Sequence, residues 1–303
     1  MDVRQLEMFR AVVEEGSFTR AAVRLNVSQS AVSRQLQLLE FELGGPLLFR
    51  SVKGVTLTPE GELLLRTANR IHRDIREAVW EISETKKLKR GQLRIAGGGT
   101  VCQYVLPHLL KRFRAQHADV DLLVKTGTTT AVLQMLRNHQ IDLALLTVPI
   151  AAPDMEVRSV LREEMVVISA PRHPVTQGAT VDAQSLSEHP LVLFEPGSNT
   201  RMLVDKFFVD QQLPMNIAME TESVEIIKAM VASGLGIALV PYAAIASDMK
   251  TNRFGWARLR GRRLYREQGW VYLKSDYMPR PITEVLRVFD AMKDQFEGKA
   301  PAR

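Results

Sequence analysis

Residues 17–44 read SFTRAAVRLNVSQSAVSRQLQLLEFELG, and this stretch decides the fold of the N-terminal part of the chain. Ser17 and Ser28 are suited to cap helices, because a serine hydroxyl accepts a hydrogen bond from a backbone N–H of the first helical turn. The stretch therefore predicts a helix at 18–25 and a second from Ser28 to about Leu43, joined by a tight turn. The expected buried residues are Phe18, Ala21, Ala22 and Leu25 in the first helix and Ala31, Val32, Leu36, Leu39 and Leu43 in the second.

The sequence on either side predicts a helix before this pair and a β-hairpin after it. Apolar residues repeat at helical spacing in 6–13, and Gly16 is placed to end that helix. Two short apolar pieces, 47–49 and 55–57, are typical of hairpin strands, with Gly54 in the turn. Two helices joined by a short turn and followed by a hairpin form a winged helix-turn-helix, whose second helix enters the major groove of DNA.

The polar residues at the start of the second helix are candidates for DNA contacts. Arginine can bind guanine through two hydrogen bonds, and glutamine and serine can also read base edges. The helix N-terminus is suited to a phosphate, and basic hairpin side chains could reach the backbone or the minor groove. The alternative is that these residues form an ordinary solvated helix face. The candidates are Ser28, Gln29, Ser30, Ser33, Arg34 and Gln37 on the helix, and Arg50 and Lys53 on the hairpin.

Residues 2–65 closely resemble the DNA-binding module of LysR-type transcriptional regulators. Ser30 stands where that family usually has proline. Residues 47–50 read LLFR in place of the family's commoner Leu-Phe-x-Arg, which puts the large apolar side chain of Phe49 near the hairpin. The first departure bears on base preference and the second on the packing of the hairpin. The segments that carry the resemblance are LEMF at 6–9, GSFTRAA at 16–22, SQSAVSRQL at 28–36, LEFELG at 39–44 and LTPEGE at 57–62.

The resemblance extends over essentially the whole chain and implies a DNA-binding transcriptional regulator under the control of a small-molecule effector. In such proteins a linker helix connects the winged helix-turn-helix to a sensor domain. The sensor has two Rossmann-like lobes, as in periplasmic solute-binding proteins, and the effector lies in the cleft between them. RNA polymerase is a further expected partner.

A long helix is predicted from about Pro59 to Leu88, with Thr58 as its cap. Its apolar residues alternate in steps of four and three, the spacing of a two-stranded coiled coil. We therefore expect a dimer through this helix, a tetramer through the sensor domains, and an inverted-repeat operator in double-stranded DNA. The alternative is an amphipathic helix that lies on its own domain. The residues with this spacing are Leu64, Ala68, Ile71, Ile75, Ala78, Ile82 and Thr85.

Beyond a charged break at 86–91, strands alternate with helices, which implies a parallel sheet covered on both faces. The expected helices include one from Val101 to His117, kinked at Pro107, and one at 282–296, and a short strand is expected at 165–169. The predicted domains are 1–58 for DNA binding, 59–90 for the linker and 91–303 for effector binding. Lobe I is expected at about 91–161 and 268–297, and lobe II at about 162–267.

The effector site is expected where strands end and helices begin, because open α/β sheets bind ligands at the carboxyl ends of their strands. Helix N-termini and hydroxyl groups there favour a small organic anion. Arg201 could anchor its charge, or could instead point to solvent, and the only carboxylates expected nearby are Glu195 and Glu222. Each threonine could also be a simple helix cap. The candidates are Thr100, Val101, Thr128, Thr129, Thr147, Ser198, Asn199, Arg201 and Ser223.

Composition excludes several other classes of protein. The net charge of +6 is compatible with a nucleic-acid partner, and the single cysteine, Cys102, excludes an internal disulfide and a multi-cysteine metal site. A helix dipole could lower the pKa of Cys102, but burial as a small apolar residue is the favoured interpretation. The six histidines do not group, so we expect no metal, no cofactor and no enzymatic activity.

The N-terminus contains no signal peptide, and the apolar runs are too short to span a bilayer, so we expect a cytoplasmic protein. This expectation and the N-terminal module both argue against a solute-binding protein that never touches DNA.

Overall fold

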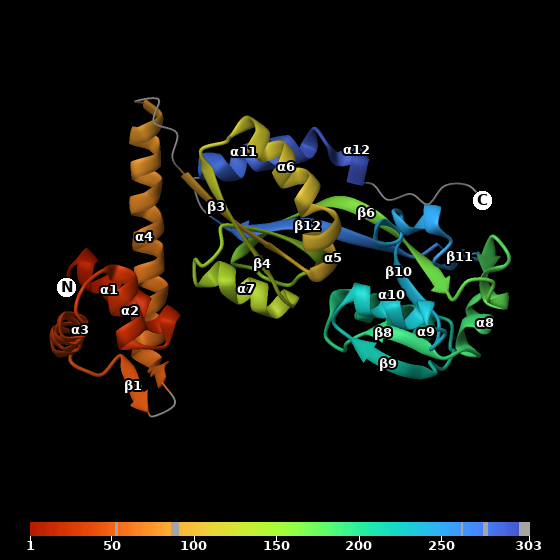
Figure 1. Ribbon diagram of the computed structural model, residues 1–303, viewed down its shortest axis with the longest axis horizontal. Helices are drawn as coiled ribbons and strands as arrows, with labels where there is room; N and C mark the ends of the chain where they lie inside the picture. The colour runs from red at the N-terminus through yellow and green to blue at the C-terminus, as the bar shows by residue number, and fades with distance from the viewer. Residues whose placement is uncertain (52–53, 86–90, 262, 275–277, 297–303) are drawn as a thin grey trace. The chain divides into compact units, whose positions relative to one another are not determined.

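The computed structural model describes residues 1–51, 54–85, 91–261, 263–274 and 278–296 (Figure 1). The chain divides into two compact units. The first comprises Met1–Gly91 with Arg137–Gln140, and the second comprises Gln92–Leu136 with Ile141–Arg303. Within the described ranges, no helix combines the length and the apolar character that a membrane span requires.

The N-terminal unit is a winged helix-turn-helix, as predicted. Ser17 accepts a hydrogen bond from the backbone N–H of Arg20, and Ser28 from that of Ala31, so both serines are helix caps. Gly16 has a left-handed φ of 60°, a conformation that glycine adopts without steric cost. The elements are α1 (Val3–Glu15), α2 (Phe18–Leu25), α3 (Gln29–Leu43), β1 (Leu48–Ser51), β2 (Gly54–Leu57) and α4 (Pro59–Thr85).

One hydrophobic core holds these elements together. The predicted faces of α2 and α3 supply Ala21, Val32 and Leu36, each fully buried, and Phe9 of α1 packs with them. Leu43, in contrast, is 46% exposed, because the last turn of α3 lies outside this core. The predicted buried face is therefore right along most of α3 and wrong at its end.

Helix α4 starts as predicted, with the backbone N–H of Gly61 donating to Thr58 Oγ1 at 3.0 Å. Leu64 and Ala68 are buried in the core of their own unit, so this part of the helix follows the alternative interpretation. Ile75 is 39% exposed and belongs to no core. The predicted end at Leu88 and the side chains of Ile82 and Thr85 lie outside the described residues.

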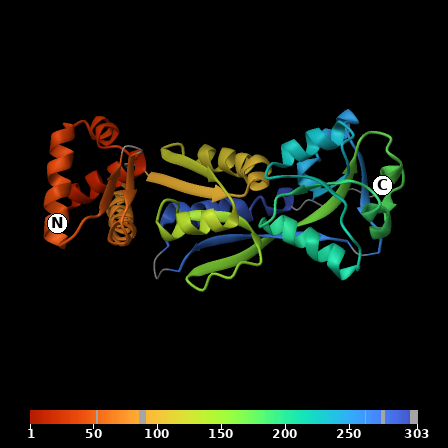
Figure 2. The same cartoon turned by 90° about the horizontal axis from the view of Figure 1, so that it is seen from below.

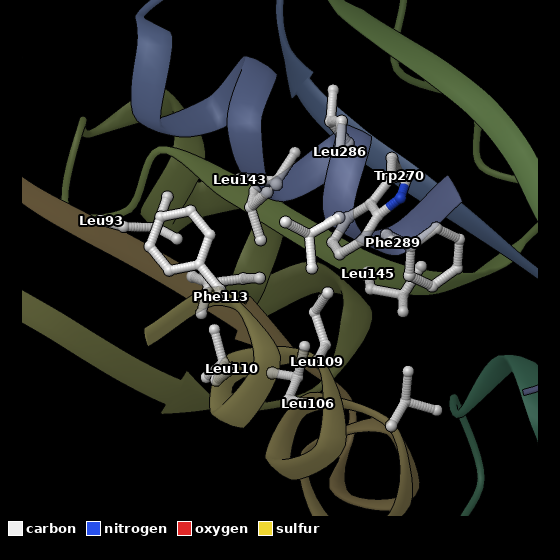
Figure 3. Close-up of a cluster of buried hydrophobic side chains, with 14 of the residues drawn as sticks. Leu93, Leu106, Leu109, Leu110, Phe113, Leu143, Leu145, Trp270, Leu286 and Phe289 are labelled. Atoms are coloured by element: carbon white, nitrogen blue, oxygen red, sulfur yellow. The ribbon is translucent and has the colours of Figure 1, made fainter. Parts of the chain in front are cut away.

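The first lobe of the C-terminal unit has a sheet covered on both faces, with α6 and α11 on one side and α7 on the other (Figure 1). Trp270 is fully buried in the core to which α6 and α11 contribute, with its ring 5.1 Å from that of Phe289 (Figure 3). The elements are β3 (Gly91–Gly97), α5 (Gly99–Tyr104), α6 (Leu106–Gln116), β4 (Val120–Thr126), α7 (Thr129–Arg137), β5 (Leu143–Val148), α11 (Arg280–Asp290) and α12 (Lys293–Phe296).

The strands of the second lobe, two of which form a separate parallel sheet, also have one core on each side. Helix α9 packs in one core and α10 in the other. The elements are η1 (Pro174–Thr176), β7 (Thr180–Val181), α8 (Ala183–Ser187), β8 (Leu191–Phe194), α9 (Asn199–Asp210), β9 (Ile217–Thr221), α10 (Val224–Ala232), β10 (Ala238–Pro241), η2 (Tyr242–Ala244), η3 (Asp248–Thr251) and β11 (Gly255–Leu259).

Two long strands, β6 (Met155–Ser169) and β12 (Tyr265–Leu273), run from one lobe into the other (Figures 1 and 2). They pair antiparallel with each other, and β12 is also antiparallel to β5. The strand order is β4-β3-β5-β12-β6-β11-β7, with β10 also paired to β6. The expected parallel pairing is present between β3 and β5, but the sheet as a whole is mixed, because the two strands that connect the lobes run antiparallel to their neighbours.

Two predicted helices are each divided in the structure. The helix expected at 101–117 is α5 followed by α6, and Pro107 lies in the first turn of α6, where its missing N–H costs no hydrogen bond. The helix expected at 282–296 is α11 followed by α12. The strand expected at 165–169 is only the end of β6. Strands β7, β9 and β11 were not predicted.

Candidate functional site

The start of α3 forms an exposed polar surface on the N-terminal unit. Ser28, Gln29 and Ser30 are exposed in the cap and first turn, and Arg34 and Gln37 follow on successive turns. Ser30 and Arg34 are four residues apart and Arg34 and Gln37 are three apart, so these three side chains lie along one face of the helix. Ser33 is half-buried beside them.

The long side chains of this surface are not committed to internal contacts. Among the described residues, Arg34, Gln29 and Gln37 have no hydrogen-bond or ion-pair partner. The Ser30 hydroxyl lies 3.0 Å from that of Ser28, so the serine that replaces the family's usual proline joins the helix cap. The side chain of Arg50 and the whole of Lys53 lie outside the described residues.

A pocket of about 540 Å³ lies between the two lobes of the C-terminal unit. It is formed where strands of both lobes end and helices begin, as the rule for open α/β sheets predicts. The structure brings eight of the nine candidate effector residues to its wall. They are Thr100, Val101, Thr128, Thr129, Thr147, Ser198, Asn199 and Ser223.

Three helices of eight or more residues begin at this wall, and their caps differ. Thr128 Oγ1 accepts from the backbone N–H of Ala131 at 3.3 Å, and Ser198 Oγ from that of Arg201 at 3.0 Å. Both side chains are therefore caps, as the alternative interpretation holds, and they also line the pocket. Ser223 makes no side-chain cap, so backbone N–H groups in the first turn of α10 lack this partner. Such groups favour an anion.

The structure does not bring the ninth candidate, Arg201, to the pocket. Its guanidinium donates to the backbone oxygen of Phe194 at 2.8 Å and pairs with Asp205 at 2.6 Å and Glu220 at 2.5 Å. Burying an arginine is costly unless such partners compensate its charge. Arg201 therefore stabilises lobe II, and this interpretation replaces the expected anion anchor.

A different arginine, Arg266 of β12, lines the pocket instead. It is buried and pairs with Glu163 of β6, with 2.6 Å between Nη2 and Oε2. Its Nη1 donates to Thr100 Oγ1 at 2.9 Å and to Thr200 Oγ1 at 3.2 Å. Arg266 was missed because the site was sought only where strands end and helices begin, and Arg266 lies at the start of β12. The available signal was that both strands carry charged residues among their apolar ones, five of them in β6.

Cys102 also lines the pocket. Burial raises the pKa of the thiol, and this effect outweighs the hydrogen bonds of Thr126 and the Gly97 carbonyl, which lower it. The thiol packs against the core of the first lobe, so the favoured interpretation, in which burial outweighs the helix dipole, is confirmed. A raised pKa disfavours the reactive thiolate.

Comparisons with known proteins agree with both parts of the chain. Residues 3–62 match the family described as "Bacterial regulatory helix-turn-helix protein, lysR family", and residues 86–293 match "LysR substrate binding domain". The chain is 33% identical over 246 residues to the HTH-type transcriptional activator CmpR of Synechocystis, covering 81% of each protein. It is 30% identical over 302 residues to the HTH-type transcriptional regulator GltR of Bacillus subtilis, covering 99% of each.

A solved structure shows the same fold along the whole chain. A full-length OxyR variant from Pseudomonas aeruginosa superposes with a TM-score of 0.79 at 24% identity, covering 100% of this chain and 99% of that one. The two family matches together span most of the sequence. The chain therefore belongs to the LysR family of bacterial transcriptional regulators.

Proposed function

We propose that this regulator reads an inverted-repeat operator with the start of α3 and responds to a small organic anion bound between its two lobes. The observation that carries the proposal is the pocket of about 540 Å³, in which helix N-termini and hydroxyl groups from both lobes meet. A ligand in such a pocket contacts both lobes at once. It therefore favours one arrangement of the lobes over others, which is the condition for a shift of population.

The DNA-binding part of the proposal is supported by the uncommitted side chains on α3. Arg34 and Gln37 lose no internal hydrogen bond when they turn toward base edges. We assign Ser28 and the helix N-terminus to a phosphate, and Gln29, Ser30 and Ser33 to base or backbone contacts. Arg50 and Lys53 are assigned to the DNA backbone on the basis of the sequence alone.

We further propose that α4 joins two copies of the chain and that the sensor domains join two dimers into a tetramer. The exposed Ile75 supports an interface along the later turns of α4, beyond the part that packs into its own unit. A two-fold dimer presents two recognition helices symmetrically, so each operator half-site should repeat in inverted orientation.

The family consists of transcriptional regulators, and we infer that this chain acts in the cytoplasm as a regulator, with no catalytic step and no cofactor. RNA polymerase is the partner through which a change at the operator would reach transcription.

The test of the proposed pocket is a thermal-unfolding screen of the full-length chain against small organic acids, followed by calorimetric titration of any acid that stabilises it. Thr128→Val removes a hydroxyl from the pocket with little change in volume, and it should weaken binding while the protein still folds. Thr283→Val, an exposed threonine on α11 outside the pocket, is the matched control and should bind as the wild type does. Equal affinity of all three proteins for the acid would contradict the proposed site.

A further inference from the structure

A buried polar network lies at the wall of the pocket and draws on both lobes. Arg266 and Glu163 are partners in the register of β12 and β6, and each is at most 3% exposed. Thr100 comes from α5 of the first lobe and Thr200 from α9 of the second, and both are at least nine-tenths buried. Gln268 is fully buried and donates to the same carboxylate as Arg266.

Glu163 neutralises the arginine. Its Oε2 accepts from Arg266 Nε at 3.0 Å and Nη2 at 2.6 Å, and from Gln268 Nε2 at 3.1 Å. Among the described residues that line the pocket, Arg266 is the one cation, and the other charged side chains are Glu195 and Glu222. The pocket therefore presents no uncompensated positive side chain to a ligand, in spite of its arginine.

The two threonines retain their donor capacity. A threonine hydroxyl has one hydrogen to donate and two lone pairs that accept. Arg266 Nη1 donates to both oxygens, at 2.9 Å for Thr100 and 3.2 Å for Thr200, and so occupies a lone pair of each. Among the described residues, neither hydroxyl has an acceptor for its own hydrogen. Both threonines line the pocket, and both hydroxyls are held near the same nitrogen, so they can donate together to one acceptor group.

On the basis of the proposed function, we propose that Glu163 sets the charge that the pocket accepts. By neutralising Arg266 it makes the arginine a positioning residue, which orients the hydroxyls of Thr100 and Thr200 toward the effector. The acceptor group of the effector is then a singly charged carboxylate held by hydrogen bonds. A dianion would have to lose its hydration without a free cation to pair with, beside the carboxylates of Glu195 and Glu222.

The test removes the neutralising charge and uses inorganic sulfate as a dianionic probe. In Glu163→Gln the amide replaces the carboxylate at nearly the same volume, and Arg266 becomes an unpaired cation at the pocket wall. Thermal unfolding of the full-length chain is followed against sodium sulfate, with sodium chloride at equal ionic strength as the reference. Glu163→Gln should bind sulfate at least tenfold more tightly than the wild type, seen as an added rise in Tm that saturates with sulfate.

Glu164→Gln is the matched control. Glu164 is the next residue of β6 and is equally buried, and it pairs with Arg258 Nε at 3.0 Å, but neither residue lines the pocket. Sulfate stabilises most proteins in a general way, and that part of the response should be the same in all three proteins. A saturable gain for Glu163→Gln alone is the expected result. An equal response of Glu163→Gln, Glu164→Gln and the wild type would overturn the proposal.

A second variant separates the effect on sulfate binding from any destabilisation caused by Glu163→Gln alone. Glu163→Gln/Arg266→Met leaves no charge at this site, and it should fold and respond to sulfate no more than the wild type does. A gain that persists in this double variant would show that Arg266 is not its source and would overturn the proposal. If Glu163→Gln unfolds without sulfate, sulfate should restore its cooperative unfolding, and failure to do so counts against the proposal.

The outcome is independent of the effector screen. A sulfate gain in Glu163→Gln with unaltered acid binding in Thr128→Val would uphold the charge-setting role and place the effector elsewhere.

Discussion

Arg34→Ala tests how the start of α3 reads DNA. Arg34 is exposed and has no internal partner among the described residues, so its removal should change the stability of the fold by less than about 0.5 kcal/mol. A bidentate contact to guanine contributes about 1–3 kcal/mol at each half-site. A dimer on an inverted repeat has two such contacts, so the loss should be about 2–6 kcal/mol, or about 30-fold to about 20,000-fold in affinity.

The assay uses operator DNA selected from a random library by the wild-type protein. Fluorescence anisotropy at one fixed salt concentration then compares the selected DNA with a scrambled duplex, because affinities for DNA depend strongly on salt. Arg66→Ala, an exposed arginine of α4, is the control and should bind both duplexes as the wild type does. Equal losses of Arg34→Ala on selected and scrambled DNA would show that Arg34 contacts phosphate, and the assignment to base reading would be refuted.

Three further outcomes follow from particular residues. Ile75→Asp should place charges in the α4 interface and weaken both dimerisation and operator binding; an unchanged mass by light scattering would exclude this helix as the interface. Thr58→Ala removes a buried hydroxyl that donates to the Pro46 carbonyl at 2.9 Å and accepts from Gly61, and it should cost about 1–2 kcal/mol by urea unfolding, whereas Thr58→Ser should restore most of the loss. Cys102, whose thiol pKa is raised by burial, should react with a thiol reagent at pH 8 more slowly in the folded than in the unfolded protein, and equal rates would contradict the burial.

The N-terminal unit could be predicted closely because its signals are local. Ser17, Ser28 and Thr58 cap helices within three residues of themselves, so the sequence alone contains both partners of each hydrogen bond. The exposure of Leu43 at the end of α3 was not predictable in the same way. The spacing of apolar residues shows which face of a helix is buried, but it does not show how far along the helix the core extends.

Pocket residues that stand at the ends of strands could be predicted. Those whose place depends on contacts between residues far apart in the sequence were missed. Thr100, Thr128 and Ser198 follow from the rule for α/β sheets. The interaction of Arg266 with Thr100 joins residues 166 positions apart, and that with Glu163 joins residues 103 apart. The first ten residues of β6 include five charged residues and show no regular alternation of polar and apolar residues, because the strand passes from one lobe to the other and its surroundings change along it.

Arg201 was assigned to the pocket wrongly because only one of its two acidic partners is close to it in the sequence. Asp205 stands four residues later on the same helix, which is a local signal for an ion pair, but Glu220 comes from β9, a strand that was not predicted. Without that strand the arginine could be assigned to the pocket or to solvent with equal reason. In the structure, the ion pair with the Glu220 carboxylate shows that Arg201 is committed to contacts within lobe II.

The central claim is that a small organic anion in the pocket changes how the protein engages its operator. The most direct measurement is a nuclease footprint of the full-length protein on the selected operator, with and without a saturating concentration of the acid found in the screen, for the wild type and Thr128→Val. We expect the acid to alter the footprint of the wild type or the protein concentration needed for it, and Thr128→Val to need much more acid for the same change. Identical wild-type footprints with and without bound acid, or an equal response of Thr128→Val, would contradict the claim.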